Sequence, residues 1–219
     1  MSLTQADHVF ASLHENGLND FLTAVFTARR HYLNYGTSLF VPTSTATASH
    51  IATIPFPGIP GGIEWAVSFS IPRIDLYPQT TALPPQLTLN PGQFSVRTRA
   101  RLQLGCIERG QFPGLEERTH LRAHPIAASL DVFAVGHPTV HYVTGTSGDI
   151  GLAVDAVELV DVAPDQLESL LECLILMLLQ SVLANVRFSF YALRAGAFAL
   201  ALQRGPLIEG DQLKLYGTT

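Results

Sequence analysis

Two pairs of histidines have the spacing at which a zinc-binding helix carries its ligands. The pairs are His120 with His124 and His137 with His141. On a helix this spacing would place two imidazoles on one face. Pro125 and Pro138 lie within or beside these segments, which are therefore expected to be strand and loop. Residues four apart in a strand are about 13 Å from each other, so neither pair can chelate alone, and no metal site is predicted.

A nucleophilic serine and a phosphate-binding loop are two further candidates for chemistry. Ser147 lies in Gly145-Thr146-Ser147-Gly148, which differs from the G-x-S-x-G elbow of hydrolases and has no histidine or acid at a recognisable spacing. The glycine-rich segment 58–62 would need a helix N-terminus after it to hold a phosphate, and a strand is expected instead. Both segments are predicted to be plain turns. No catalytic residue and no cofactor are expected, and the chain is not expected to be an enzyme.

A basic stripe runs along one predicted strand, formed by Arg97, Arg99 and Arg101. It could meet lipid headgroups or an acidic partner, or it could be the solvated outer face of a half-buried strand, balanced by acids on neighbouring strands. The net charge of −5 and the absence of a Lys/Arg block argue against a nucleic-acid partner.

Aromatic side chains are the remaining candidates for a binding surface, and they are expected to point inward. They could line a pocket for an apolar ligand or simply pack in the core, and the sequence does not separate the two. The set is Trp65, Phe69, Phe188, Phe190 and Phe198.

By length the chain could be one domain or a tight pair, and a single domain over residues 1–219 is predicted. Its two cysteines suit a reducing compartment or indifference to redox. The charged fraction of 14% is low against a typical ~25%. Cys106 and Cys173 are both expected to be buried thiols. The N-terminal residues lack the basic-then-apolar layout of a signal peptide, so a cytoplasmic location is expected.

The segment 163–185 is the clearest helix. Asp165 and Glu168 resemble a capping box, and the uninterrupted apolar run 173–179 is far shorter than the ~20 residues that a membrane span needs. Because the later turns lack a polar side, the helix is expected to be enclosed by its own chain. The residues predicted to share its main face are Leu167, Leu170, Leu171, Leu174, Met177, Leu178 and Ser181.

A first amphipathic helix is predicted over 13–28, after the capping-box pattern Ser12-Leu13-His14-Glu15. Residues 6–11 could be a short strand or the start of this helix. Its apolar spacing is carried by Leu18, Phe21, Leu22 and Val25.

Between and after the helices the residues alternate as strands do, which places the acids Glu64 and Asp75 on the outward faces of their strands. The phase of this alternation shifts at Pro72 and near Ala156, as a β-bulge shifts it in a bent strand. The Pro/Gly-rich segment 108–117 is expected to be a loop. The predicted strands are 32–41, 44–54, 63–71, 74–76, 95–107, 126–132, 148–162, a strand opening at Phe188 and Phe190, 198–202 and a last one at Leu213 to Leu215.

Long strands with bends predict an α+β fold in which a long, strongly curved antiparallel sheet wraps around a C-terminal apolar helix, with a short N-terminal helix. The segments SLHENGLNDFL and GPLIEGDQLKLYG, together with the order of the elements, resemble the TULIP (tubular lipid-binding) superfamily, closest in style to its soluble bacterial members. The resemblance implies a lipid or another elongated apolar ligand held between sheet and helix.

We therefore expect a non-catalytic module that binds a lipid or hydrophobic small molecule in a groove. The alternative is a structural or interaction subunit with a fully packed core, which meets a partner protein or a second copy through strand edges. No transmembrane segment is expected. The residues predicted to bind the ligand are Trp65, Val67, Phe69, Leu102, Leu104, Leu152, Val154, Leu174, Met177, Leu178, Phe188 and Phe190.

Overall fold

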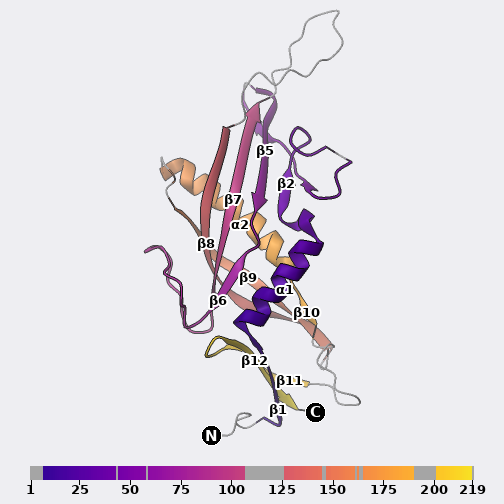
Figure 1. Cartoon of the computed structure of the whole chain (residues 1–219), viewed down its shortest axis with the longest axis vertical. Coiled ribbons are helices and arrows are strands. Elements are labelled where there is room, and N and C mark those ends of the chain that lie inside the picture. The colour runs from indigo at the N-terminus through magenta and orange to yellow at the C-terminus, as the bar shows by residue number, and fades with distance from the viewer. Residues whose placement is uncertain are drawn as a thin grey trace, which may run out of the picture. The chain divides into compact units, whose positions relative to one another are not determined.

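The computed structural model has two helices and a strongly curved, mostly antiparallel sheet, which confirms the predicted α+β class (Figure 1). It describes residues 7–42, 44–57, 59–106, 126–144, 147–160, 162, 165–189 and 201–218. The strands are β1 (Val9–His14), β2 (Asn34–Gly36), β3 (Ser49–His50), β4 (Ile54–Phe56), β5 (Ile59–Phe69), β6 (Arg73–Leu76), β7 (Phe94–Cys106), β8 (Ile126–Thr144), β9 (Ser147–Val160), β10 (Phe188–Ser189), β11 (Ala201–Ile208) and β12 (Gln212–Thr218); the helices are α1 (Glu15–Ala28) and α2 (Asp165–Ala184), with a 3-10 turn at Arg30–Tyr32.

The chain divides into two compact units. The first comprises Met1–Val25, Pro72–Thr98 and Val132–Thr219, and the second comprises Phe26–Ile71 and Arg99–Asp131. Strands β7 and β8 run from one unit into the other, so a single domain over 1–219 stays a prediction.

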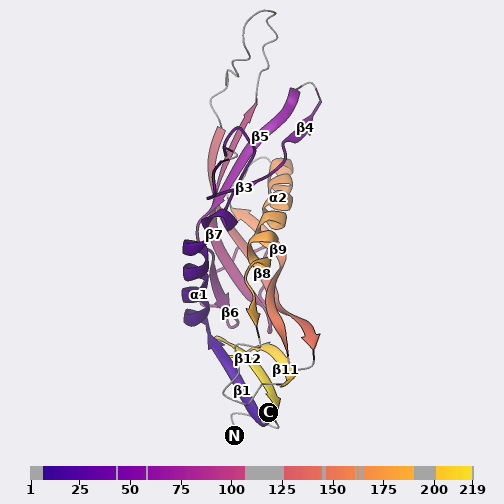
Figure 2. The ribbon, with the colours of Figure 1, turned by 90° about the vertical axis from the view of Figure 1, so that its right-hand side faces the viewer.

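The first unit contains two sets of strands. One is a three-stranded antiparallel sheet in the order β1-β12-β11. In the other, β10 pairs with β9, β8 follows β9, and β6 pairs with the first part of β7. Helix α2 packs against β9, as Figure 2 shows.

The second unit contains a further set of strands. The later part of β7 pairs with β5, which pairs with β2 and β4, and β3 lies parallel to β2. This parallel pair is why the sheet is mostly rather than wholly antiparallel. The strand predicted over 32–41 shrinks to β2, because Thr37 turns the chain: its carbonyl accepts the backbone N–H groups of Phe40 and Val41.

The predicted alternation of buried and exposed side chains in the long strands is confirmed at most positions. In β7, Val96, Ala100 and Leu102 are buried while Arg97 and Arg99 are exposed. In β9, Ile150, Leu152 and Val154 are buried, and so is Leu159, which stands at an odd spacing from them. The predicted phase shift near residue 156 is therefore present, and it lets both ends of β9 bury apolar side chains.

Two acids that the alternation placed outside the core are buried instead. Glu64 of β5 is 6% exposed, on a sheet face that residues 37–41 cover: a Cβ at Gly105, its partner on β7, would lie 3.3 Å from the Phe40 ring. Asp75 of β6 is 8% exposed, because its carboxylate accepts hydrogen bonds from the backbone N–H groups of Thr80 and Thr81.

Helix α1 begins at Glu15, so the capping box predicted at Ser12 is wrong. Ser12 belongs to β1 and pairs with Lys214 of β12, which also shows that the ambiguous N-terminal segment is a strand from Val9. The buried face of α1 is formed by Leu18, Leu22 and Phe26.

The expectation that α2 is enclosed on every side is wrong. One face is buried, and the opposite flank is open: Leu170 is 58% exposed and Met177 54%. Cys173 on the same flank is exposed, against the prediction of a buried thiol. The residues of the buried face are Leu171, Ile175, Leu178, Leu179, Val182, Leu183 and, just past the helix, Val186.

The remaining predictions concern turns, and segments that lie partly outside the described residues. Asn90-Pro91-Gly92 forms a turn, with Gly92 at φ +86° and the Gln93 N–H donated to the Asn90 carbonyl. The turn predicted at 58–62 is wrong at 59–62, because β5 begins at Ile59, and Gly58 lies outside the described residues. The loop 108–117, His120, His124, Phe190, Phe198 and the Cys106 side chain lie outside the described residues. Among the helices described, none is long and apolar enough to span a bilayer.

Candidate functional site

An open cleft of about 340 Å³ lies within the first unit, where α2 meets β9. Strands β8 and β9 supply one wall, and the exposed flank near the C-terminal end of α2 supplies the other. The residues that line it are Thr139, His141, Gly151, Leu152, Ala153, Val154, Gln180, Ala184 and Arg187.

Small side chains leave the space that makes this cleft. Gly151, Ala153 and Ala184 occupy positions in its wall, and a Cβ added to Gly151 would already lie 3.0 Å from Thr139 Oγ1. Larger residues at these positions would fill the hollow.

Two polar contacts fix the α2 side of the cleft. The Gln180 side-chain amide donates a hydrogen bond to the Val154 carbonyl at 3.3 Å, which ties the helix to β9. Beyond the helix end, Arg187 Nε donates to the Ala184 carbonyl at 3.3 Å, one of the carbonyls that a helix C-terminus leaves without an intrahelical partner.

The predicted ligand-binding residues fall into two groups. Leu152 and Val154 line the cleft. Elsewhere in the first unit, Leu178 is buried, Leu174 is half-buried and Met177 is exposed on α2. Phe188 is half-buried with its ring centroid 4.7 Å from that of Phe21. In the second unit Trp65, Val67, Phe69 and Leu102 are buried and Leu104 is half-buried.

Sequence reasoning missed the polar and small residues of the cleft. Gln180, Ala184 and Arg187 are not in the predicted ligand-binding set, which contains only large apolar residues. The only signal in the sequence is a Gln and an Ala on an otherwise leucine-rich segment. Local periodicity does not show that α2 packs against β9.

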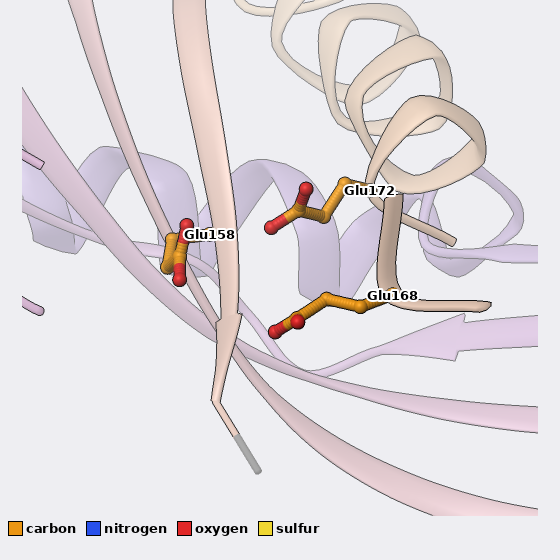
Figure 3. A group of neighbouring side chains, drawn as sticks. All are labelled: Glu158, Glu168 and Glu172. Atoms are coloured by element: carbon orange, nitrogen blue, oxygen red, sulfur yellow. The ribbon is translucent and has the colours of Figure 1, made fainter. Parts of the chain in front are cut away.

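A second cluster joins the start of α2 to β9 through three carboxylates. Glu168 and Glu172 reach from the helix toward Glu158 on the strand (Figure 3), and their oxygens lie within 4.8 Å of one another. Glu172 Oε1 accepts the backbone N–H of Leu159 at 3.4 Å. Oxygen donors of this kind suit hard cations, but a group of half-exposed acids does not by itself define a metal site.

This carboxylate cluster has a distinct electrostatic property. Partial burial raises the pKa of Glu158, and the negative charges of Glu172 and Glu168 raise it further. Glu158 therefore takes up a proton more readily than an isolated glutamate does.

A more polar cleft of about 250 Å³ lies between α1, β6 and β7 in the same unit, and its groups serve the fold. Asn19 donates to the Ile74 carbonyl and accepts the Ile74 N–H, each at 2.8 Å. Glu15 accepts the Leu76 N–H, and burial raises the pKa of its carboxyl despite that bond. These contacts dock α1 on β6.

Arg97 and Arg99 of the arginine stripe and His137 of the described histidine pair have ordinary partners. Arg99 Nε lies 3.0 Å from Asp131 Oδ1, and the Arg97 guanidinium lies 5.4 Å from the centroid of the Phe133 ring. His137 Nδ1 is 2.8 Å from Asp155 Oδ1. His137 and His141 both lie on β8, so they stand in a strand, as predicted, rather than on a zinc-binding helix.

Comparison with known proteins gives no match: no protein-family model, no curated protein and no solved structure matches this chain. The cleft and its lining residues are therefore the basis for assigning a function.

Proposed function

We propose that this protein is a non-catalytic binding module that holds an elongated apolar ligand, such as a lipid, between α2 and β9. The observation that carries the proposal is the cleft itself, which includes Leu152 and Val154 from the predicted binding set. Its volume lies at the lower end of the roughly 300–1,000 Å³ typical of small-molecule pockets. In this proposal the ligand occupies an open cleft on α2, whereas the sequence predicted a groove beside an enclosed helix.

The resemblance to TULIP proteins belongs to the same proposal. A strongly curved, mostly antiparallel sheet with an apolar helix packed on it is consistent with that architecture. The exposed flank of α2 departs from a fully wrapped helix.

The test is a titration with a fluorescent fatty acid, an 11-carbon chain carrying an environment-sensitive dye, against wild type and two variants. Ala184→Leu fills the cleft with a side chain that favours helix, whereas Ser169→Leu adds the same side chain to the exposed surface of α2 outside the cleft lining. We expect saturable uptake by wild type and Ser169→Leu and at least tenfold weaker uptake by Ala184→Leu. No uptake by wild type, or equal uptake by all three proteins, would refute the proposal.

One observation favours a second function, that of an interaction subunit. The exposed flank of α2 carries Leu170, Cys173 and Met177, and a row of exposed apolar side chains on one helix face marks a surface that another protein can cover. Light scattering distinguishes the two functions: an assembly that dissociates in a Leu170→Gln, Met177→Gln double variant supports the interaction subunit.

A further inference from the structure

Two basic side chains stand among the apolar residues of the cleft between α2 and β9. Arg187 follows the C-terminal end of α2, and His141 lies on β8. The remaining lining is apolar or uncharged, so the cleft has a positive pole and no negative one. A ligand complementary to it would carry an apolar body and an anionic group.

The donors of Arg187 are largely available to such a group. Its Nε is engaged by the Ala184 carbonyl, and a guanidinium has five N–H donors, so the two terminal nitrogens can face the cleft. Fork-shaped donors of this kind match a carboxylate.

One acid of β9 beside the cleft lining already has partners. Asp155, next to Val154 in sequence, is engaged by His137 at 2.8 Å and by the Gln93 amide at 3.1 Å. In the part of the chain that the structure describes, no ion pair is formed by Arg187 or His141. Apart from Arg187 Nε, which donates to the Ala184 carbonyl, their donors are therefore available to a ligand.

We infer that the ligand is a single acyl chain ending in a carboxylate, whose carboxylate is held by Arg187 and His141 while its chain lies against Leu152, Val154 and Ala184. This inference rests on the proposed function and specifies its ligand. A cleft of about 340 Å³ suits one chain rather than the two of a phospholipid.

The inference is tested by calorimetric titration of the full chain with dodecanoate and with dodecanol, which share a chain and differ in charge, both below their aggregation concentrations. For wild type we expect dodecanoate to bind at least fivefold more tightly, because charge-assisted hydrogen bonds are among the stronger polar contacts. The Arg187→Met, His141→Gln double variant is expected to bind the two ligands equally. Arg187→Lys, which keeps the charge, is expected to retain most of the preference.

The possible results separate this inference from the proposed function. Equal affinity of wild type for both ligands overturns the inference and leaves apolar binding in place. A preference for dodecanoate that survives in the double variant also overturns it, because the carboxylate would then be held elsewhere. Binding of neither ligand by wild type overturns both. Thermal unfolding of each variant establishes that lost affinity is not lost folding. If the double variant is unstable, the single variant Arg187→Met replaces it: it is expected to lose most of the preference for dodecanoate, and full retention of that preference overturns the inference.

Discussion

Strands β8 and β9 can approach closely because residue 136 is a glycine. A Cβ at Gly136 would overlap the Ala153 carbonyl oxygen and lie 2.9 Å from the Phe94 ring, so the backbone itself would have to shift. We expect Gly136→Ala to lower the free energy of unfolding by about 2 kcal/mol or more, measured by urea denaturation.

The matched control for this change is Gly151→Ala on β9. Its added Cβ would meet Thr139 Oγ1 at 3.0 Å, the end of a side chain that can rotate away, so we expect a much smaller loss. Equal losses for the two variants would show that the close approach at Gly136 is not a constraint on the sheet.

Docking of α1 on β6 depends on one amide side chain. Asn19 satisfies both the N–H and the carbonyl of Ile74, and leaving partly buried backbone groups unpaired costs about 1–3 kcal/mol. We expect Asn19→Ala to destabilise the protein by that amount in urea denaturation. Asn19→Asp keeps the acceptor for the Ile74 N–H and should lose less; if it loses as much as Asn19→Ala, the paired hydrogen bonds are not the cause.

At the level of single residues the sequence predicts the direction of side chains in strands well and their partners poorly. Alternation placed Arg97 and Arg99 outside correctly. It failed for Glu64 and Asp75, because each is covered by a loop whose path is set by distant contacts. Alternation reports which face a residue occupies, but not what lies over that face.

At the scale of elements, the sequence predicts that α2 is a helix, but it does not predict which face of that helix is buried. Beyond its first turns the helix is apolar nearly all round, so periodicity alone could not choose the buried face. Packing of Ile175, Leu179 and Val182 decides the orientation, and it brings the earlier Glu168 and Glu172 toward β9. The carboxylate cluster is the consequence.

That cluster predicts a pH dependence of stability. The folded-state pKa of Glu158 is raised above its unfolded value, so the folded protein binds more protons between the unfolded pKa of about 4.5 and the higher folded one. Stability should therefore rise as the pH falls from neutral through the folded pKa toward about 4.5. We expect Glu158→Gln to raise stability at pH 7 by up to about 1 kcal/mol and to flatten this dependence.

Thermal unfolding at pH 7 and pH 5 measures the effect. The comparison variant is Glu209→Gln, which removes the partner of Lys214 and should change stability little and in the opposite direction. A Glu158→Gln protein that is less stable than wild type at pH 7 would show that the three carboxylates do not repel one another.

At the scale of the whole chain, the fold class followed from the sequence because long alternating strands and two helical segments define it. The single domain stays a prediction, and the binding cleft could not be derived. Its walls come from β8, β9 and α2, and which small residues of these elements meet depends on the pairing of β9 with α2. A list of large apolar residues included Leu152 and Val154 but could not show where space remains.

The exposed flank of α2 gives a prediction about assembly. If ligand binding is the function, Leu170→Gln with Met177→Gln should leave stability nearly unchanged, since both side chains are more than half exposed, and should leave the mass in solution unchanged as well. Multi-angle light scattering at several concentrations provides the measurement. A lower mass in the variant would favour the interaction subunit instead.

The central claim is that an apolar ligand lies between α2 and β9, and hydrogen–deuterium exchange with and without saturating dodecanoate tests it most directly. The account predicts slower exchange in residues 177–187 and 150–155, with no change in β1, β11 and β12. Unchanged exchange throughout, or protection confined to the three-stranded sheet, would contradict it.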